Sequence, residues 1–249
     1  MSVVPVAGGL RVLDVNIEGR KFTAADGATL HAVGQLKFKL AAASFTCIVG
    51  PSGCGKTTTL RMILGLDQEF AGHVQLSGKG TVAAVFQEPR LLPWRTVEQN
   101  VRLALPAEQA QANLDDLFTE LGLSDMRNFF PAELSLGLAR RAALARAFAL
   151  QPQLLVLDEP FVSLDDITAE RLRRLLMKLW HARPTTALMV THNLHEAALL
   201  ADRIIVFSDR PAIIIESIDI EQPQAERHAK DIDAVVLRLR GVIQQNPEE

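Results

Sequence analysis

The chain has 249 residues, a formal net charge of -3 and a pI of about 6.1, which argues against a broad basic surface for nucleic acid. Hydrophobic residues make up 48% of it, which predicts a substantial core, but no apolar run reaches the length of about 18 residues that a membrane span needs. Cys47 and Cys54 are too few for a disulfide framework and favour a reducing cytoplasm. No basic region followed by a long apolar stretch opens the chain, so no signal peptide is expected.

The N-terminal segment has the pattern of antiparallel strands. Leu36, Phe38 and Leu40 alternate with lysines, as in a half-buried strand, and turn signals stand at residues 8–9 and 26–27. A continuous apolar run at residues 44–49 then predicts a buried strand, and residues 57–66 predict a helix with one apolar face.

Between this strand and this helix lies a phosphate-binding loop. Its residues match the pattern G-x-x-x-x-G-K-[ST] in full: Gly50, Pro51, Ser52, Gly53, Cys54, Gly55, Lys56 and Thr57. Such a loop wraps backbone N–H groups around phosphate oxygens, and the helix directs its positive end at the same anion. Lys56 is expected to reach the β- and γ-phosphates, and the Thr57 hydroxyl is expected to hold Mg²⁺.

The middle of the chain, from about residue 88 to residue 150, has a helical texture. Thr96 and Gln99 form a capping-box pattern, and Leu114, Leu117 and Phe118 begin an amphipathic repeat. Ser135 is expected to open a helix that runs to about Leu150.

An apolar run at residues 154–157 ends in Asp158 and Glu159. A buried strand that delivers a carboxylate at its C-terminal end is typical of the metal site of a nucleotide-binding α/β sheet. Asp158 is therefore expected to bind Mg²⁺, and Glu159 to polarise the water that attacks the γ-phosphate. Strands and helices alternate again up to a C-terminal helix around residues 232–239, so the chain reads as an α/β core with a helical insertion between its two nucleotide motifs.

Four further motifs follow in a specific order: Gln87 after a strand, the run 134–138 (Leu-Ser-Leu-Gly-Leu) at a helix start, Asp165 shortly after Glu159, and His192 at a strand end. In this order and at these distances the chain resembles an ATP-binding cassette (ABC) ATPase from about Leu10 to about Glu216. Residues 86–94 resemble the nitrate, sulfonate and taurine import subfamily, whereas residues 139–147 also look like some bacterial lipid-trafficking cassettes. The resemblance implies a P-loop NTPase core with an N-terminal antiparallel β region and an inserted helical subdomain. It implies a single domain over 1–249, with the core at 1–87 and 151–249 and the subdomain at 88–150.

The resemblance also implies roles for these residues. Gln87 would ligate Mg²⁺ or orient water, and His192 would hold a γ-phosphate oxygen and the attacking water beside Glu159. Ser135 and Gly137 would face the γ-phosphate bound by a second copy of the chain, with Asp165 at the seam between copies. Thr58 completes the expected nucleotide-binding set beside Thr57. Phe22 is the best match to the aromatic residue that stacks on adenine, and a core position for Phe22 is the alternative.

The chain departs from the family in its signature motif. Leu136 stands where the family has glycine and Leu138 where it has glutamine, which predicts crowding near the phosphate and weaker closure of the dimer. Nearby, Arg140, Arg141 and Arg146 are expected on a solvated helix face. Trp94 is expected either at the interface with a membrane subunit or in a satellite core.

Under this resemblance the chain is the ATPase subunit of an importer for a small solute such as nitrate, a sulfonate or taurine. It would need ATP and Mg²⁺, form a homodimer, act on separate membrane permeases fed by a solute-binding protein, and lie on the cytoplasmic face of the plasma membrane without binding nucleic acid. The alternatives are the same ATPase coupled to lipid trafficking, a non-transport cassette in translation or DNA repair, and a small-molecule kinase.

Overall fold

The computed structural model describes residues 11–23, 27–78 and 80–245. The chain divides into two compact units, the first formed by Met1–Gly80 with Thr186–Glu249 and the second by Thr81–Thr185. The second unit is wider than the helical subdomain expected at 88–150, because it also includes two strands and a long helix. The finer boundaries 88 and 150 stay a prediction.

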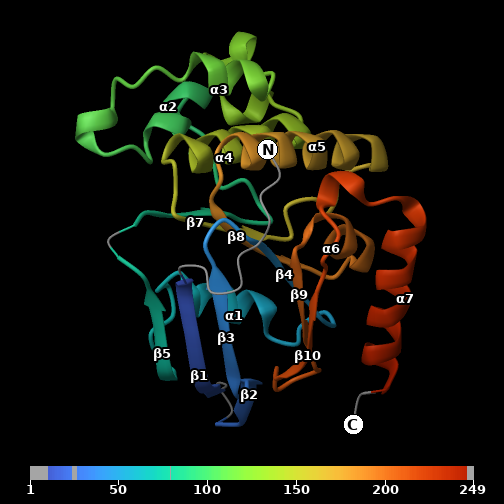
Figure 1. Cartoon of the computed structure of the whole chain (residues 1–249). Coiled ribbons are helices and arrows are strands. Elements are labelled where there is room, and N and C mark those ends of the chain that lie inside the picture. The colour runs from blue at the N-terminus through green and yellow to red at the C-terminus, as the bar shows by residue number, and fades with distance from the viewer. Residues whose placement is uncertain (1–10, 24–26, 79, 246–249) are drawn as a thin grey trace. The chain divides into compact units, whose positions relative to one another are not determined.

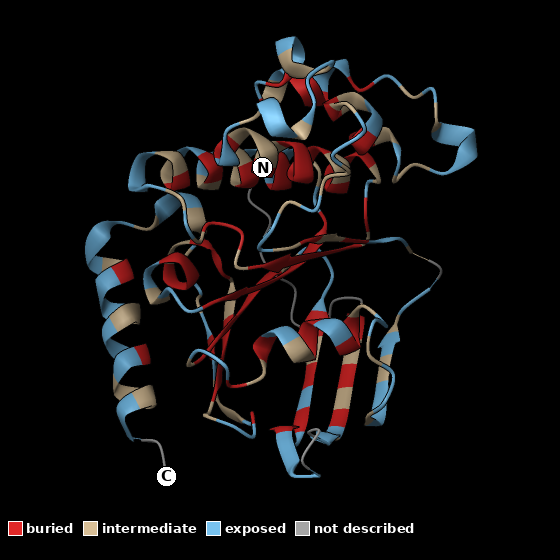
Figure 2. Cartoon of the chain, turned by 180° about the vertical axis from the view of Figure 1, so that it is seen from behind, coloured by how far each residue is buried: buried red, intermediate tan, exposed pale blue. Residues whose placement is uncertain are grey.

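The first unit contains an antiparallel sheet built on its longest strand. This strand, β1 (Arg11–Thr23), pairs with β3 (Leu36–Ala41) on one side and with β5 (Ala71–Leu76) on the other, and its end pairs with β2 (Thr29–Val33). Val15 lies opposite both Phe38 and Val74. The alternation expected for β3 is confirmed, since Leu36, Phe38 and Leu40 are buried between more exposed lysines (Figure 2).

The first unit also holds parallel strands that carry the phosphate loop. Strand β4 (Phe45–Val49) lies between β8 (Thr186–Thr191) and β9 (Arg203–Phe207) and is parallel to both, and β10 (Ile214–Asp219) adds an antiparallel edge to β9. All residues of β4 and β8 are buried, as expected for strands covered on both faces. The helices of this unit are α1 (Lys56–Ile63), α6 (Leu194–Leu200) and α7 (Ala229–Gln245), and α7 packs along α6 (Figure 1).

The second unit has two parallel strands, β6 (Val82–Val85) and β7 (Leu154–Asp158). Its helices are α2 (Val97–Arg102), α3 (Asp115–Glu120), α4 (Leu136–Ala149) and α5 (Asp166–Ala182), and α4 contacts each of the other three (Figure 1). Short 3₁₀ turns occupy Ala107–Gln109, Ser124–Met126, Pro131–Glu133 and, in the first unit, Gln224–Glu226.

Several local predictions are confirmed. Thr96 and Gln99 form the expected capping box at the start of α2, and Ser135 is the N-cap of α4. Phe118 and Leu121, from the amphipathic repeat, are fully buried. In the described part of the chain, no helix combines the length and the apolar character that crossing a bilayer requires. The expected α/β fold class is confirmed.

Candidate functional site

The phosphate loop leaves β4 and turns into α1 through two glycines with positive φ. Gly53 has φ 78° and Gly55, the N-cap of α1, has φ 124°. A Cβ atom on Gly55 would lie 2.6 Å from the carbonyl oxygen of Ala32, so no other residue fits there without moving the backbone. The backbone of the loop therefore follows a tight path that only glycine permits. Such a path leaves backbone N–H groups available to an anion.

Lys56 is folded back over this loop. Its side chain is buried, and its Nζ donates to the carbonyl oxygens of Gly50 at 2.8 Å and Pro51 at 2.5 Å. These contacts tie the ammonium group to the backbone of the same loop. Ser52, Gly53 and Thr57 are exposed and Thr58 is half-buried, so the expected phosphate and metal donors are open to solvent.

Arg210 is a residue of this loop that the sequence did not indicate. It lies beyond β9, and its guanidinium donates to the carbonyl oxygen of Gly53, with Nε at 3.1 Å. The contact fixes one peptide of the loop across 157 positions of sequence, which no local motif reports. Cys54 is buried in the same loop, and burial raises the pKa of its thiol despite the nearby Lys56.

Phe22 lies near the end of β1 with 36% of its surface exposed, so its alternative assignment to the core is wrong. The guanidinium of Arg20 stacks over the ring at 4.1 Å from the centroid, and Asp67 holds Arg20 through a 2.9 Å ion pair. A ring that is exposed and backed by a cation can accept a planar ligand, and its stacking on adenine stays a prediction.

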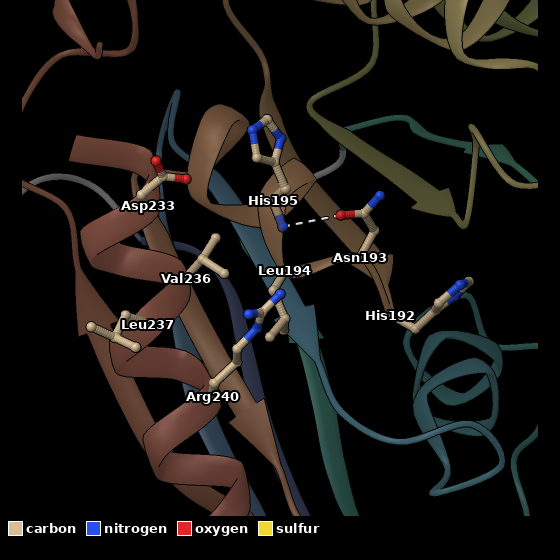
Figure 3. Close-up of a pocket in the computed structure, with 8 residues that line it drawn as sticks. All are labelled: His192, Asn193, Leu194, His195, Asp233, Val236, Leu237 and Arg240. Carbon is tan, nitrogen blue, oxygen red and sulfur yellow. Dashed lines mark hydrogen bonds between the residues drawn. The ribbon is translucent and has the colours of Figure 1, made fainter. Parts of the chain in front are cut away.

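His192 follows β8 directly and is exposed. The turn after it is fixed by polar contacts, because Thr191 Oγ1 donates to Glu196 at 2.9 Å and Asn193 Oδ1 caps α6 by accepting from His195 N at 3.0 Å (Figure 3). A pocket of about 610 Å³ adjoins this turn, and α7 supplies Asp233, Val236, Leu237 and Arg240 to it. The His192 side chain is thus placed at the end of a rigid strand and remains accessible.

In the second unit, Asp158 is the last residue of β7 and is buried, as expected for a metal ligand delivered by a strand. Glu159 follows with φ 45°, a left-handed conformation that is costly for a residue with a side chain. Such strain persists only where the surroundings hold the backbone, and it concentrates at functional sites.

Arg140 holds the backbone at Glu159 in place. The expectation that Arg140 lies on a solvated helix face is therefore wrong. Its side chain is buried and projects from α4, and its guanidinium donates to the carbonyl oxygen of Pro160, to that of Val162 at 2.5 Å and to that of Glu159 at 3.4 Å. Burial lowers the pKa of Arg140 without discharging it, because a guanidinium titrates far above neutral pH. One side chain therefore fixes the whole turn after Asp158.

Arg146, which follows Arg140 along α4 by less than two turns, binds a second loop in the same way. It donates to the carbonyl oxygens of Pro89 at 2.9 Å and Arg90 at 2.8 Å, just after Gln87, so it too is not a solvated residue. Gln87 itself is exposed, and Arg90 closes the turn by stacking over Phe86 at 4.2 Å from the ring centroid. Helix α4 thereby holds both the Gln87 turn and the Glu159 turn.

The start of α4 exposes Ser135 and buries Gly137. Ser135 Oγ accepts from Leu138 N at 3.3 Å, whereas a Cβ on Gly137 would lie 2.8 Å from Thr168 of α5. Gly137 therefore allows α4 to pack closely on Thr168 of α5 within one copy. Leu136 is 43% exposed, so its side chain is not part of the core of its own copy.

Asp165 is the N-cap of α5. Hydrogen bonds from the Thr168 hydroxyl and from the Thr168 backbone N–H, here at 2.9 Å to Oδ1, lower the pKa of Asp165. This cap explains the aspartate locally, and its role at a seam between copies stays a prediction. Trp94 is 69% exposed, so the satellite-core alternative for it is wrong.

The comparisons with known proteins show the family of the chain. Residues 33–162 match the family described as ABC transporter. The chain belongs to the ABC transporter family. It is 41% identical to "Aliphatic sulfonates import ATP-binding protein SsuB 2" of Pseudomonas savastanoi pv. phaseolicola, over 86% of this chain and 78% of that protein. It is 39% identical to the protein of the same name from Pseudomonas syringae pv. tomato, over 92% of this chain and 94% of that protein.

Among solved structures, the chain is similar to the ATP-binding cassette MJ0796 in a dimeric post-hydrolysis state bound to ADP and Pi. The TM-score is 0.70 at 25% sequence identity, over 83% of this chain and 98% of that one. Membership of this family, together with the complete phosphate loop, implies that the chain binds a nucleotide. The expected resemblance to an ABC ATPase is confirmed.

Proposed function

We propose that the chain is the ATP-hydrolysing subunit of an ABC importer for aliphatic sulfonates or closely related small anions. The observation that carries the proposal is 39–44% identity, over most of the chain, to proteins named as ATP-binding subunits for aliphatic sulfonate import. The phosphate loop, with Lys56 bonded to its backbone, supplies the chemistry that such a subunit needs.

In this proposal each predicted residue has a role in binding or hydrolysing ATP. The loop and Lys56 bind the β- and γ-phosphates, Phe22 stacks on adenine, and Glu159 takes a proton from the attacking water. The hydroxyl of Thr57, the carboxylate of Asp158 and the amide of Gln87 are oxygen donors of the kind that Mg²⁺ prefers. The metal would neutralise charge on the phosphates. His192 binds a γ-phosphate oxygen and holds the attacking water.

The second copy of the chain completes each site. Ser135 is exposed at a helix start, so its hydroxyl and the adjacent N–H groups are available to the γ-phosphate of a partner. Binding of ATP would join the copies, and hydrolysis would separate them, which transmits work to separate permease subunits. The exposed Trp94 is proposed to contact a permease, and a solute-binding protein is proposed to deliver the anion. The subunit would act at the cytoplasmic face of the membrane.

The test is Glu159→Gln, which removes a charge and keeps the shape of the side chain. ATP turnover should fall by roughly 10²–10⁴-fold while ATP binding is retained and the dimer is trapped. Lys56→Ala should instead lose ATP binding. Glu221→Gln, at an exposed carboxylate of the first unit, is the control and should change neither quantity. Near-normal turnover of Glu159→Gln in the assembled transporter would refute the assignment.

Sharing of the site between copies has its own test. Mixed dimers of Lys56→Ala with Ser135→Arg retain one site with both halves intact, whereas either pure variant has none. Turnover in the mixture that does not exceed that of the pure variants would show that each copy works alone. Substrate class is tested by uptake into vesicles that contain the permeases, with alkanesulfonates, nitrate and taurine compared side by side.

A further inference from the structure

An open pocket of about 360 Å³ in the second unit has a strongly cationic rim. It lies where the end of α3 meets α4 and α5, which are neighbours in the second unit (Figure 1). The buried Leu121 and the half-buried Leu175 contribute to its lining. Four cationic side chains also line it: Arg141, Arg171, Arg174 and Lys178.

The acidic groups near this rim already have partners. Glu120, which also lines the pocket, pairs with Arg183 at 2.8 Å, and Glu170 pairs with Arg174 at 2.7 Å. In the part of the chain that the structure describes, Arg171 and Lys178 have neither an ion pair nor a side-chain hydrogen bond. The rim therefore carries an excess of positive charge that the protein itself does not neutralise.

The spacing of these cations along α5 is unfavourable for the helix. Arg171, Arg174 and Lys178 follow one another at i, i+3 and i+7 on α5, and like charges at such spacings destabilise a helix. Arg141 of α4 reaches the same rim, where its Nη1 donates to the carbonyl oxygen of Leu121 at 3.3 Å. A Cβ on the left-handed Gly122 would lie 3.1 Å from that nitrogen. Arg174 is paired with Glu170, so three cations from two helices, Arg141, Arg171 and Lys178, lie around one pocket without an acidic partner among the described residues.

We propose that this pocket binds the phosphate group of an anionic ligand. Arginine forks match phosphate oxygens in geometry and charge, and an anion between the four cations would turn repulsion into attraction. Residues from the middle of α4 and α5 line the pocket, whereas Ser135 and Asp165 lie at the starts of these helices. The pocket is therefore separate from these two predicted nucleotide-binding residues. A free phosphate compound and a phospholipid headgroup share this chemistry, and the experiment distinguishes them.

The first test measures the repulsion without ligand. The double variant Arg171→Gln/Lys178→Gln should raise the melting temperature by about 1–2 °C in low salt, and the gain should vanish in high salt. Arg95→Gln, at an exposed cation of the same unit outside the pocket, is the control and should leave the melting temperature unchanged. A double variant that melts at or below the wild-type temperature would contradict the proposal.

The second test measures binding on the full chain with saturating Mg-ADP, so that the phosphate loop is filled. One arm titrates pyrophosphate, and the other uses vesicles of phosphatidylcholine with and without phosphatidylglycerol. Wild type should bind at least one probe about tenfold more tightly than the double variant does, while Arg95→Gln should match wild type. Binding of pyrophosphate alone identifies a free ligand, and binding of the charged vesicles alone identifies a headgroup. Binding of neither probe, or equal binding by the double variant, overturns the proposal.

Discussion

The phosphate loop and the two turns held by α4 differ in where their shape comes from. The loop is one continuous segment, and most of its contacts lie within it, such as those of Lys56 with Gly50 and Pro51. The Gln87 and Glu159 turns are instead fixed by arginines that lie 56 and 19 positions away in the sequence. A loop of the first kind can be recognised from its own residues, whereas a turn of the second kind depends on side chains that no local pattern marks.

The largest effect is expected from Gly55→Ala, which tests whether the loop is as self-contained as it looks. The new Cβ would lie 2.6 Å from the Ala32 carbonyl at a φ of 124°, so the loop must move. Nucleotide affinity should fall by about 100-fold or more, and the free energy of unfolding by about 2–4 kcal/mol.

The matched control is Gly65→Ala, because Gly65 also has positive φ but nothing lies within 4 Å of its Cβ position. It should lose only about 1 kcal/mol of stability and retain nucleotide binding. Isothermal titration with ADP and chemical denaturation provide the two measurements. Equal losses in both variants would mean that backbone strain, and not the contact with Ala32, dominates.

Arg140→Gln tests the dependence of the Glu159 turn on α4, and its total effect is expected to be smaller because nucleotide binding is spared. Three carbonyl oxygens lose a charged donor, which should cost about 2–4 kcal/mol of stability. ATP turnover should fall because the strained Glu159 loses its support, while the ADP affinity of the loop is retained.

Arg146→Gln removes two such contacts and should cost less, about 1–3 kcal/mol. Arg95→Gln is the surface control and should stay within about 0.5 kcal/mol of wild type. Denaturation and steady-state turnover on the same preparations separate the effects. Equal stability of Arg140→Gln and Arg95→Gln would show that the Glu159 turn does not depend on Arg140.

The smallest effect is expected from Leu136→Gly. Since Leu136 is 43% exposed, its removal leaves no large void in its own copy, and the melting temperature should change little. If the side chain opposes closure, the ATP-bound dimer should gain about 1 kcal/mol. Leu136→Ala separates the loss of bulk from the added freedom of glycine. A lower melting temperature without tighter dimerisation, measured by sizing across ATP concentrations, would contradict the crowding argument.

Much of the fold could be predicted because strong local patterns agree with it. The phosphate loop, the capping box at Thr96 and the alternation of β3 each depend on residues close together in sequence. The roles of Arg140 and Arg146 could not be predicted, because a charged residue type does not indicate burial. Their partners are backbone carbonyl groups, which every residue has and which no sequence pattern marks. The role of Arg210 could not be predicted for the same reason. Phe22 and Trp94 were undecided between surface and core, since an aromatic residue suits both.

Because Cys54 is buried, chemical labelling of its thiol can measure the opening of the phosphate loop in solution. Its sulfur lies beneath the backbone that would hold phosphate, and its raised pKa keeps the reactive thiolate scarce. Cys47, the other cysteine of the chain, is buried in β4, and complete burial raises the pKa of its thiol well above the ordinary value. Alkylation of Cys54 therefore requires the loop to open locally. The rate of alkylation measures how often that opening occurs. Nucleotide bound on the loop would lower the alkylation rate of Cys54, and the rate would fall as the fraction of nucleotide-bound chains rises.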